Sequence, residues 1–183
     1  MQCNFSQYSS RYDAFCAGQV APSFDPNCAG GALMDLNVYN ISYIVGLFGE
    51  PNRVNYAANI DHGIDTSGIL TMDYTGFKAV SMAAKDCAAP ARCIIQGTKG
   101  YIQQKSTANC CGGITFHPNE GKEEHYNLNG GRPREAAEFE TFARAMESGD
   151  QELCTRMQDT SIAVSRVLTV ARRSAGIRFP GER

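Results

Sequence analysis

The sequence has little of what marks several common functional classes. Its formal net charge is −2, and no run of lysine or arginine exceeds two residues, so it lacks the basic patch of nucleic-acid-binding proteins. Its apolar stretches are far too short to span a bilayer, and its N-terminus has no basic region followed by an apolar core. These features argue against nucleic acid and membrane as partners and predict a cytoplasmic protein.

The glycine-rich signature G-x-G-x-x-G and the strand–helix–strand alternation of dinucleotide-binding folds are also missing. We therefore expect no Rossmann domain in this chain and no measurable binding of NAD or NADP by the chain alone.

The eight cysteines contain no C-x-x-C pair, and the three histidines do not bracket them, so no metal site is expected. The stretch from Asp61 to Asp65, which includes His62, is more typical of hydrogen bonding in a loop than of metal binding. The compartment rule favours reduced, mostly buried thiols, although an even number of cysteines leaves disulfides open.

The chain of 183 residues, 43% of them hydrophobic and 20% charged, is suited to a single globular domain. A weak strand is expected within residues 1–10, followed by a loop over residues 11–28. The clearest helix ends at Gly49 and Pro51. Its apolar stripe consists of Met34, Val38, Ile41, Val45 and Phe48.

The middle of the sequence predicts strands and hairpins, and its end predicts helices. Strands are expected over residues 53–60, 69–74, 77–85, 92–96, 101–105, 114–117 and 125–128. The two closing helices have stripes of Phe139, Phe142, Ala143 and Met146, and of Leu153, Met157, Val164, Leu168 and Ala171, with Asp150 as N-cap of the second. The pattern predicts an α+β fold, in which a large, mostly antiparallel sheet carries helices on one face.

Asp35 and Tyr39 are the best candidates for chemistry. They are four residues apart in the first helix, so their side chains are expected to be neighbours at the edge of the apolar stripe. A carboxylate that orients a phenol is a workable acid/base pair if the pKa of the phenol is lowered. The alternative is structural: an aspartate in a first turn complements the helix dipole, and a tyrosine beside a stripe often packs. Spacing alone favours that alternative.

Two motifs resemble a known family. The stretch from Gly30-Gly31 through Asp35 and Tyr39 to Leu47-Phe48-Gly49-Glu50-Pro51 is similar to the opening of the C-terminal domain of Gfo/Idh/MocA oxidoreductases. The segment Ile95–Ile102, with Gly97-Thr98-Lys99-Gly100, resembles the family's G-T-x-G strand turn. The resemblance covers essentially the whole chain and implies a C-terminal domain like that of glyceraldehyde-3-phosphate dehydrogenase.

The resemblance also implies roles for particular residues. Asp35 matches the substrate-orienting carboxylate, and Tyr39 stands at the acid/base position, as in the branch with tyrosine that includes glucose–fructose oxidoreductase and dimeric dihydrodiol dehydrogenase. Arg11 and Tyr12 fall where the family often places substrate contacts, although a solvated loop is the alternative. Asn37 replaces a common glycine. The family's lysine from an E-K-P motif belongs to the nucleotide-binding domain and has no counterpart in this sequence.

We therefore expect residues 1–183 to be one substrate-binding and oligomerisation domain, the C-terminal part of a longer enzyme. This chain alone is expected to be inactive. The resemblance implies interconversion of a hydroxyl and a carbonyl on a sugar, polyol or similar molecule, with NAD or NADP held mainly by an N-terminal domain. The alternative is a non-catalytic ligand-binding or oligomerisation module of the same fold. A homodimer or higher homo-oligomer through the sheet is expected, with apolar side chains from Leu70, Met72, Tyr74 and Val80.

Overall fold

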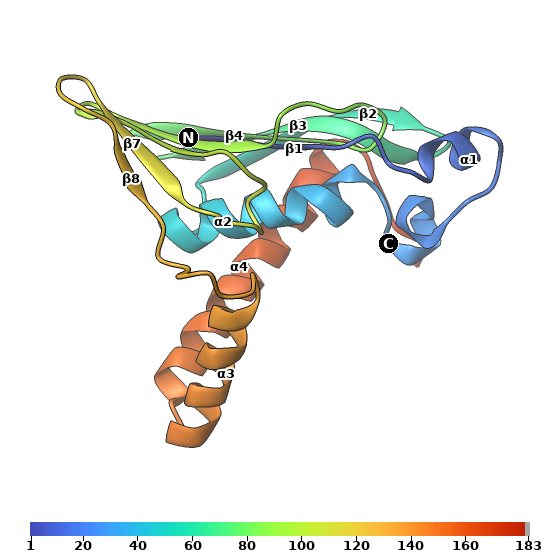
Figure 1. Cartoon of the computed structure of the whole chain (residues 1–183). Helices are drawn as coiled ribbons and strands as arrows, with labels where there is room; N and C mark the ends of the chain where they lie inside the picture. The colour runs from blue at the N-terminus through green and yellow to red at the C-terminus, as the bar shows by residue number, and fades with distance from the viewer. Residues whose placement is uncertain (182–183) are drawn as a thin grey trace.

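The computed structural model describes residues 1–181, whose strands form one eight-stranded mixed sheet in the order β2-β3-β4-β1-β5-β6-β7-β8. Helices α2 and α4 lie beneath one face of the sheet, and the described chain leaves the other face uncovered (Figure 1). The predicted α+β class is confirmed. The strands are β1 (Gln2–Ser6), β2 (Arg53–Asp61), β3 (Ile64–Tyr74), β4 (Phe77–Ala84), β5 (Arg92–Gly97), β6 (Gly100–Gln104), β7 (Ile114–Pro118) and β8 (Glu124–Tyr126).

The helical elements lie before, between and after the strands. The segment predicted as a loop over residues 11–28 contains three short helical turns, so that prediction was too simple. The elements are α1 (Tyr12–Cys16), the 3-10 turns η1 (Pro22–Phe24) and η2 (Pro26–Cys28), the π-helical turn η3 (Leu33–Asn37), α2 (Val38–Phe48), α3 (Ala136–Ser148) and α4 (Gln151–Ser174). None of the helices in residues 1–181 is long and apolar enough to cross a membrane.

The parallel pair of β1 and β4 determines where the polar residues gather. All other strand pairs of residues 1–181 are antiparallel, whereas β1 runs beside β4 in the same direction and ends with Ser6 opposite Ala84. The chains stay together past the strands, because the amide of Ser9 donates to the carbonyl of Lys85 at 2.9 Å. The residues that follow both strands therefore lie at one edge of the sheet, where parallel sheets usually carry their ligands.

The predicted helix exists, but its buried face differs from the predicted stripe. The π-helical turn at its start contains a wider backbone ring than an α-helical turn and changes the phase of the residues around it. Ile41 and Val45 are buried as expected, whereas Phe48 is 38% exposed. Leu33 and Ile44 are fully buried instead.

The main core lies between the sheet and the helices. Leu70 and Met72 of β3 pack there with Ile41 of α2 and with Val167 and Ala171 of α4. The side chain of Asp150 accepts a hydrogen bond from the amide of Leu153 at 2.9 Å, which confirms the predicted N-cap of α4.

The first half of α4 and all of α3 extend away from the sheet as a helical hairpin (Figure 1). The predicted apolar stripe of α3 is largely exposed: Phe139 is 70% and Met146 is 84% exposed. The position of α3 matches the prediction, and the assumption that its stripe is buried was wrong for this chain.

The open face of the sheet carries different apolar residues from those expected. Leu70, Met72 and Tyr74 are buried on the helical side, so they are not available to a partner on the other face. Ile69 is 48% exposed, and it alternates with these residues and therefore points the other way. Of the predicted residues, only Val80 remains, since it is paired with Thr71 on the open face.

The cysteines also differ from expectation, because only Cys3 and Cys93 are buried. The remaining six are partly or fully exposed.

Candidate functional site

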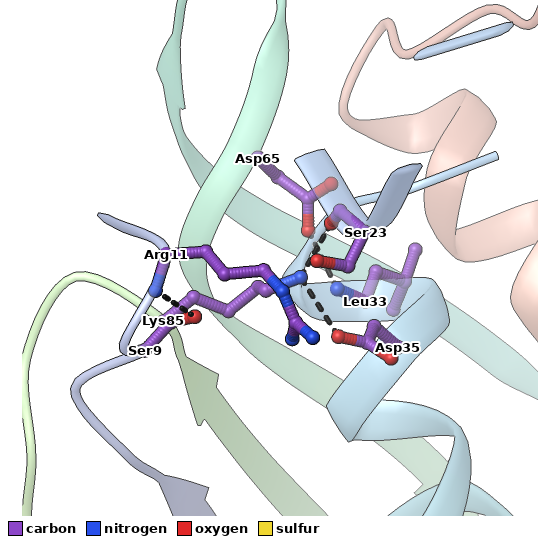
Figure 2. Close-up of polar contacts among 7 residues, drawn as sticks. All are labelled: Ser9, Arg11, Ser23, Leu33, Asp35, Asp65 and Lys85. Carbon is purple, nitrogen blue, oxygen red and sulfur yellow. Dashed lines mark hydrogen bonds and ion pairs between the residues drawn. The ribbon is translucent and has the colours of Figure 1, made fainter. Parts of the chain in front are cut away.

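The candidate site lies at the edge of the sheet where β1 and β4 end. Arg11 follows β1, Lys85 follows β4 directly, and Asp35 is carried by the π-helical turn η3 (Figure 2). Three chain segments that are distant in the sequence thus bring a guanidinium, an ammonium and a carboxylate into one region.

Lys85 is a deeply buried charged group of this region. Its side chain is 2% exposed, and its Nζ donates to Oδ2 of Asp35 at 2.8 Å. Nζ also donates to the carbonyl oxygen of Ser23 and lies 4.2 Å from the ring centroid of Phe24. A buried ammonium requires compensation of this kind, because removal from water is costly for a charge. The side chain of Asp35 is 45% exposed.

Asp65 of β3 holds the start of the same helical turn. Its Oδ2 accepts hydrogen bonds from the amide of Leu33 at 2.6 Å and from the hydroxyl of Tyr56 at 2.8 Å. Burial raises the pKa of Asp65 to about 6, and these hydrogen bonds oppose the shift because they favour the ionised form. The prediction of a hydrogen-bonding role for this part of the chain is confirmed, although Asp65 lies in a strand and not in a loop.

The two glycines before the turn allow this close packing. A Cβ atom at Gly31, whose φ is +114°, would lie 2.1 Å from Oδ1 of Asp65. A Cβ atom at Gly30 would lie 2.8 to 2.9 Å from backbone atoms of residues 22–25. Both positions require glycine. The structure therefore explains the Gly-Gly motif by the close approach of backbone and side chains.

Asp35 and Tyr39 both lie on the exposed side of the helix, near the ends of β4 and β1 respectively. Tyr39 is 42% exposed, and its ring centroid lies 5.9 Å from that of Phe5 in β1. Within residues 1–181, no hydrogen bond joins Asp35 to Tyr39. In this structure the carboxylate pairs with Lys85, and the ring of Tyr39 lies against Phe5.

The two residues proposed as substrate contacts lie in different surroundings. Arg11 is exposed, and its side chain extends past Lys85 in the direction of Asp35 (Figure 2). Tyr12 packs in an aromatic cluster, 6.2 Å from the rings of both Phe15 and Phe24. Hydrogen bonding to Cys16 raises the pKa of the Tyr12 phenol. The position of Arg11 is compatible with a substrate contact, whereas Tyr12 has packing partners of its own.

A cavity of about 450 Å³ lies beside this aromatic cluster, lined in part by Phe15, Phe24 and His62. Asp35 and Tyr39 do not line it. In the part of the chain that the structure describes, no group of three or more His, Cys, Asp or Glu side chains could hold a metal ion. The polar groups of the site are supplied by one helix and two strand ends.

Sequence reasoning missed Lys85 and the anchoring role of Asp65. In the sequence, Lys85 is marked only by its position directly after the strand Phe77–Ala84. A lysine in such a position is usually exposed to solvent, so its burial could not be expected. Its partner Asp35 is 50 residues away in the sequence, so no local pattern could have shown the pair.

Comparisons with known proteins agree with the architecture. Residues 1–103 match the family model described as the GFO/IDH/MocA C-terminal domain. Scyllo-inositol 2-dehydrogenase (NADP(+)) IolU of Bacillus subtilis (strain 168) is 32% identical over 182 residues, which cover 98% of this chain and 55% of that protein. D-xylose 1-dehydrogenase (NADP(+)) 2 of Haloferax volcanii is 30% identical over 164 residues, which cover 82% of this chain and 47% of that protein.

A solved structure shows the same fold at low sequence identity. The inositol dehydrogenase homolog from Azotobacter vinelandii, complexed with NADH and myo-inositol, has a TM-score of 0.69 at 11% identity, over 96% of this chain and 54% of that one. The chain thus spans about half the length of the relatives that it matches. From the family match and the identity to curated relatives, we conclude that the chain belongs to the GFO/IDH/MocA family and corresponds to its C-terminal domain.

Proposed function

We propose that this chain is the substrate-binding domain of an NAD(P)-dependent oxidoreductase that interconverts a hydroxyl and a carbonyl on a polyol or sugar. The observation that carries the proposal is the placement of Asp35 and Tyr39, both about half exposed, beside the ends of two parallel strands. The names of the curated relatives support the substrate class, since one is an inositol dehydrogenase and one a xylose dehydrogenase.

In the proposed reaction, Asp35 and Tyr39 have separate tasks. The free oxygen of the Asp35 carboxylate accepts a hydrogen bond from a substrate hydroxyl and thereby orients it. The hydroxyl of Tyr39 exchanges a proton with the reacting oxygen as general acid or base. Arg11 contributes a further hydrogen-bond donor from the chain that follows β1, and we propose the same role for the hydroxyl of Tyr12.

A nicotinamide cofactor would supply the hydride donor or acceptor when bound. The described residues contain no glycine-rich turn between a strand and a helix for the phosphates of such a cofactor, and the residues of the site suit a hydroxyl-bearing substrate. We therefore assign the cofactor mainly to an N-terminal domain of a longer protein, with residues 1–183 forming a single C-terminal domain.

A non-catalytic module of the same fold is the second candidate. The observation in its favour is that Asp35 already has a partner in Lys85 and Tyr39 a ring contact with Phe5. Both residues would then be structural. Turnover distinguishes the two candidates, because only the first requires it.

We further propose that the protein forms a homodimer through the open face of the sheet, where Ile69 and Val80 supply apolar surface. Light scattering of this chain at micromolar concentration should give about twice its 19.9 kDa mass. A monomer at that concentration would contradict the proposed interface.

The test of the proposed function uses the full-length protein that contains this chain. Reduction of NAD and of NADP is followed by absorbance with a panel of inositols, aldoses and other polyols. We expect turnover with at least one member of the panel and none with matched deoxy compounds that lack the reacting hydroxyl. Absence of turnover with every polyol and both cofactors, in a protein shown to be folded, would overturn the proposal.

A further inference from the structure

The burial of Lys85 calls for an explanation, because removing its charge from water is costly. The side chain is 2% exposed, and lysine is almost never fully buried unless paired. Its ammonium has three donors and three partners: the carboxylate of Asp35, the carbonyl of Ser23 and the ring of Phe24. All three partners lie in other segments of the chain, so Lys85 links the end of β4 to residues 23–24 and to the turn that carries Asp35.

The two oxygens of the Asp35 carboxylate differ because of this contact. Oδ2 accepts the hydrogen bond from Lys85 at 2.8 Å, whereas Oδ1 has no hydrogen bond with any residue of the range 1–181. The side chain is 45% exposed. One oxygen is thus held by the protein, and the other is open to a ligand.

The backbone that carries Asp35 is held separately. Asp65 accepts the amide of Leu33 at 2.6 Å, and the amide of Asp35 itself donates to the carbonyl of Gly31 at 3.0 Å. The backbone of the turn therefore does not depend on Lys85. Lys85 contacts the Asp35 side chain directly, whereas the Ser23 carbonyl beside it is also held by the amide of Gly31 at 3.1 Å (Figure 2).

We propose that Lys85 is a positioning residue that fixes the carboxylate of Asp35 in the orientation that turnover requires. This inference rests on the function proposed above for Asp35. It assigns to this chain a positive charge next to the substrate-orienting carboxylate, independent of any lysine from another domain.

A purely structural role would not need the charge. Breaking a buried ion pair is costly when the charge left behind stays buried, so an apolar side chain of similar length can replace one partner at small cost only when the other partner reaches water. Lysine to methionine is such a change, because it keeps the length of the stem and removes the ammonium. The carboxylate left behind is half exposed and can be solvated.

The first test compares crystal structures of the full-length protein and its Lys85→Met variant. We expect the turn Leu33–Asn37 to be unchanged, because Asp65 still holds it, and the Asp35 carboxylate to leave its position or occupy several rotamers. An Asp35 side chain in the same single position in both structures would overturn the proposal. Lys85→Gln, which retains a neutral donor, is the second variant if Lys85→Met does not fold.

The second test measures kcat and KM for a polyol turned over by the wild-type protein, together with melting temperature. Misplacement of a reacting group by about 1 Å can cost on the order of 100-fold in rate, so we expect Lys85→Met to lower kcat by about 10- to 100-fold. KM and melting temperature should change little. Lys78→Met is the matched control, because Lys78 also pairs with an aspartate, at 3.1 Å, but is 68% exposed and lies at the start of β4.

The outcomes separate this inference from the proposed function. Wild-type turnover in Lys85→Met would overturn the role of Lys85 while leaving the proposed function intact. If the wild-type protein turns over no polyol, the proposed function fails, and the crystal comparison still decides whether Lys85 positions Asp35.

Discussion

Asp65 and Lys85 are buried charged residues that hold the same helical turn from neighbouring strands, but their charges are compensated differently. Asp65 is surrounded by neutral donors, the Leu33 amide and the Tyr56 hydroxyl, and burial raises its pKa to about 6. Lys85 faces an opposite charge, the carboxylate of Asp35. Asp65 can lose its charge by taking up a proton near neutral pH. Lys85 depends on a particular partner, so each should respond to a different perturbation.

The largest effect on stability is expected when the partner of Lys85 is removed. Asp35→Asn leaves a buried ammonium without a countercharge and should destabilise the protein by about 3 kcal/mol. Lys85→Met removes the buried charge itself and leaves a carboxylate that is 45% exposed and can be solvated, so it should cost less, about 1 kcal/mol. Urea unfolding at pH 7 measures both, and the double variant should recover most of the loss seen in Asp35→Asn.

The control for this prediction is Asp73→Asn, which removes the partner of the exposed Lys78. An exposed pair contributes little, so the change should stay within about 0.5 kcal/mol. Equal losses in Asp35→Asn and Lys85→Met would contradict the asymmetry between a buried ammonium and a half-exposed carboxylate.

The next effect concerns the pH dependence of stability caused by Asp65. The pKa of Asp65 is raised from 3.8 to about 6 in the folded protein. The folded state therefore binds more protons than the unfolded state between about pH 4 and 6, and this group lowers stability as the pH rises through that window. A shift of this size corresponds to about 2 to 3 kcal/mol.

Asp65→Asn isolates this contribution, because all other titrating groups are shared with the wild type. Urea unfolding of both proteins at pH 4 and pH 7 should show that wild type loses about 2 to 3 kcal/mol more than the variant over this interval. The same change in stability for both proteins between pH 4 and pH 7 would show that burial does not raise the pKa of Asp65.

The smallest expected effect belongs to Arg11, whose side chain is exposed and can contribute only binding. Arg11→Met in the full-length protein should raise KM by about 10-fold, equivalent to about 1.4 kcal/mol, and leave kcat and melting temperature nearly unchanged. Arg53→Met is the control, because Arg53 is exposed and opens β2 opposite Asp73, away from the site. An unchanged KM would show that Arg11 is a solvated residue and does not contact the substrate.

Much of the fold could be predicted from local patterns. Alternation identified the hairpins over β3–β4, β5–β6 and β7–β8, and helical spacing identified α2, α3 and α4. The position of β1 between β4 and β5 could not be predicted, because it depends on pairing with residues about 80 to 90 positions away. The phase of the first helix was also missed, since nothing in the apolar spacing reveals a π-helical turn.

The site was predictable only in part, for a related reason. Asp35 and Tyr39 stood out because a family resemblance added information to their spacing. The role of Lys85 depends on its hydrogen bonds to Asp35 and Ser23, and that of Asp65 on its hydrogen bonds with Leu33 and Tyr56. All of these contacts join residues that are distant in the sequence or lie in different strands and helices. The exposure of the apolar stripe of α3 likewise depends on which segments pack against the helix, and the spacing of apolar residues cannot show this.

The central claim, that this chain contributes an acid/base tyrosine to an oxidoreductase, is tested most directly by comparing Tyr39→Phe with Tyr43→Phe in the full-length protein. Both residues lie on α2, and Tyr43 packs against the main core. Tyr39→Phe should lower kcat by about 10²- to 10⁴-fold with little change in melting temperature, whereas Tyr43→Phe should retain wild-type turnover. Near wild-type turnover of Tyr39→Phe would show that Tyr39 is a packing residue and would contradict the mechanism.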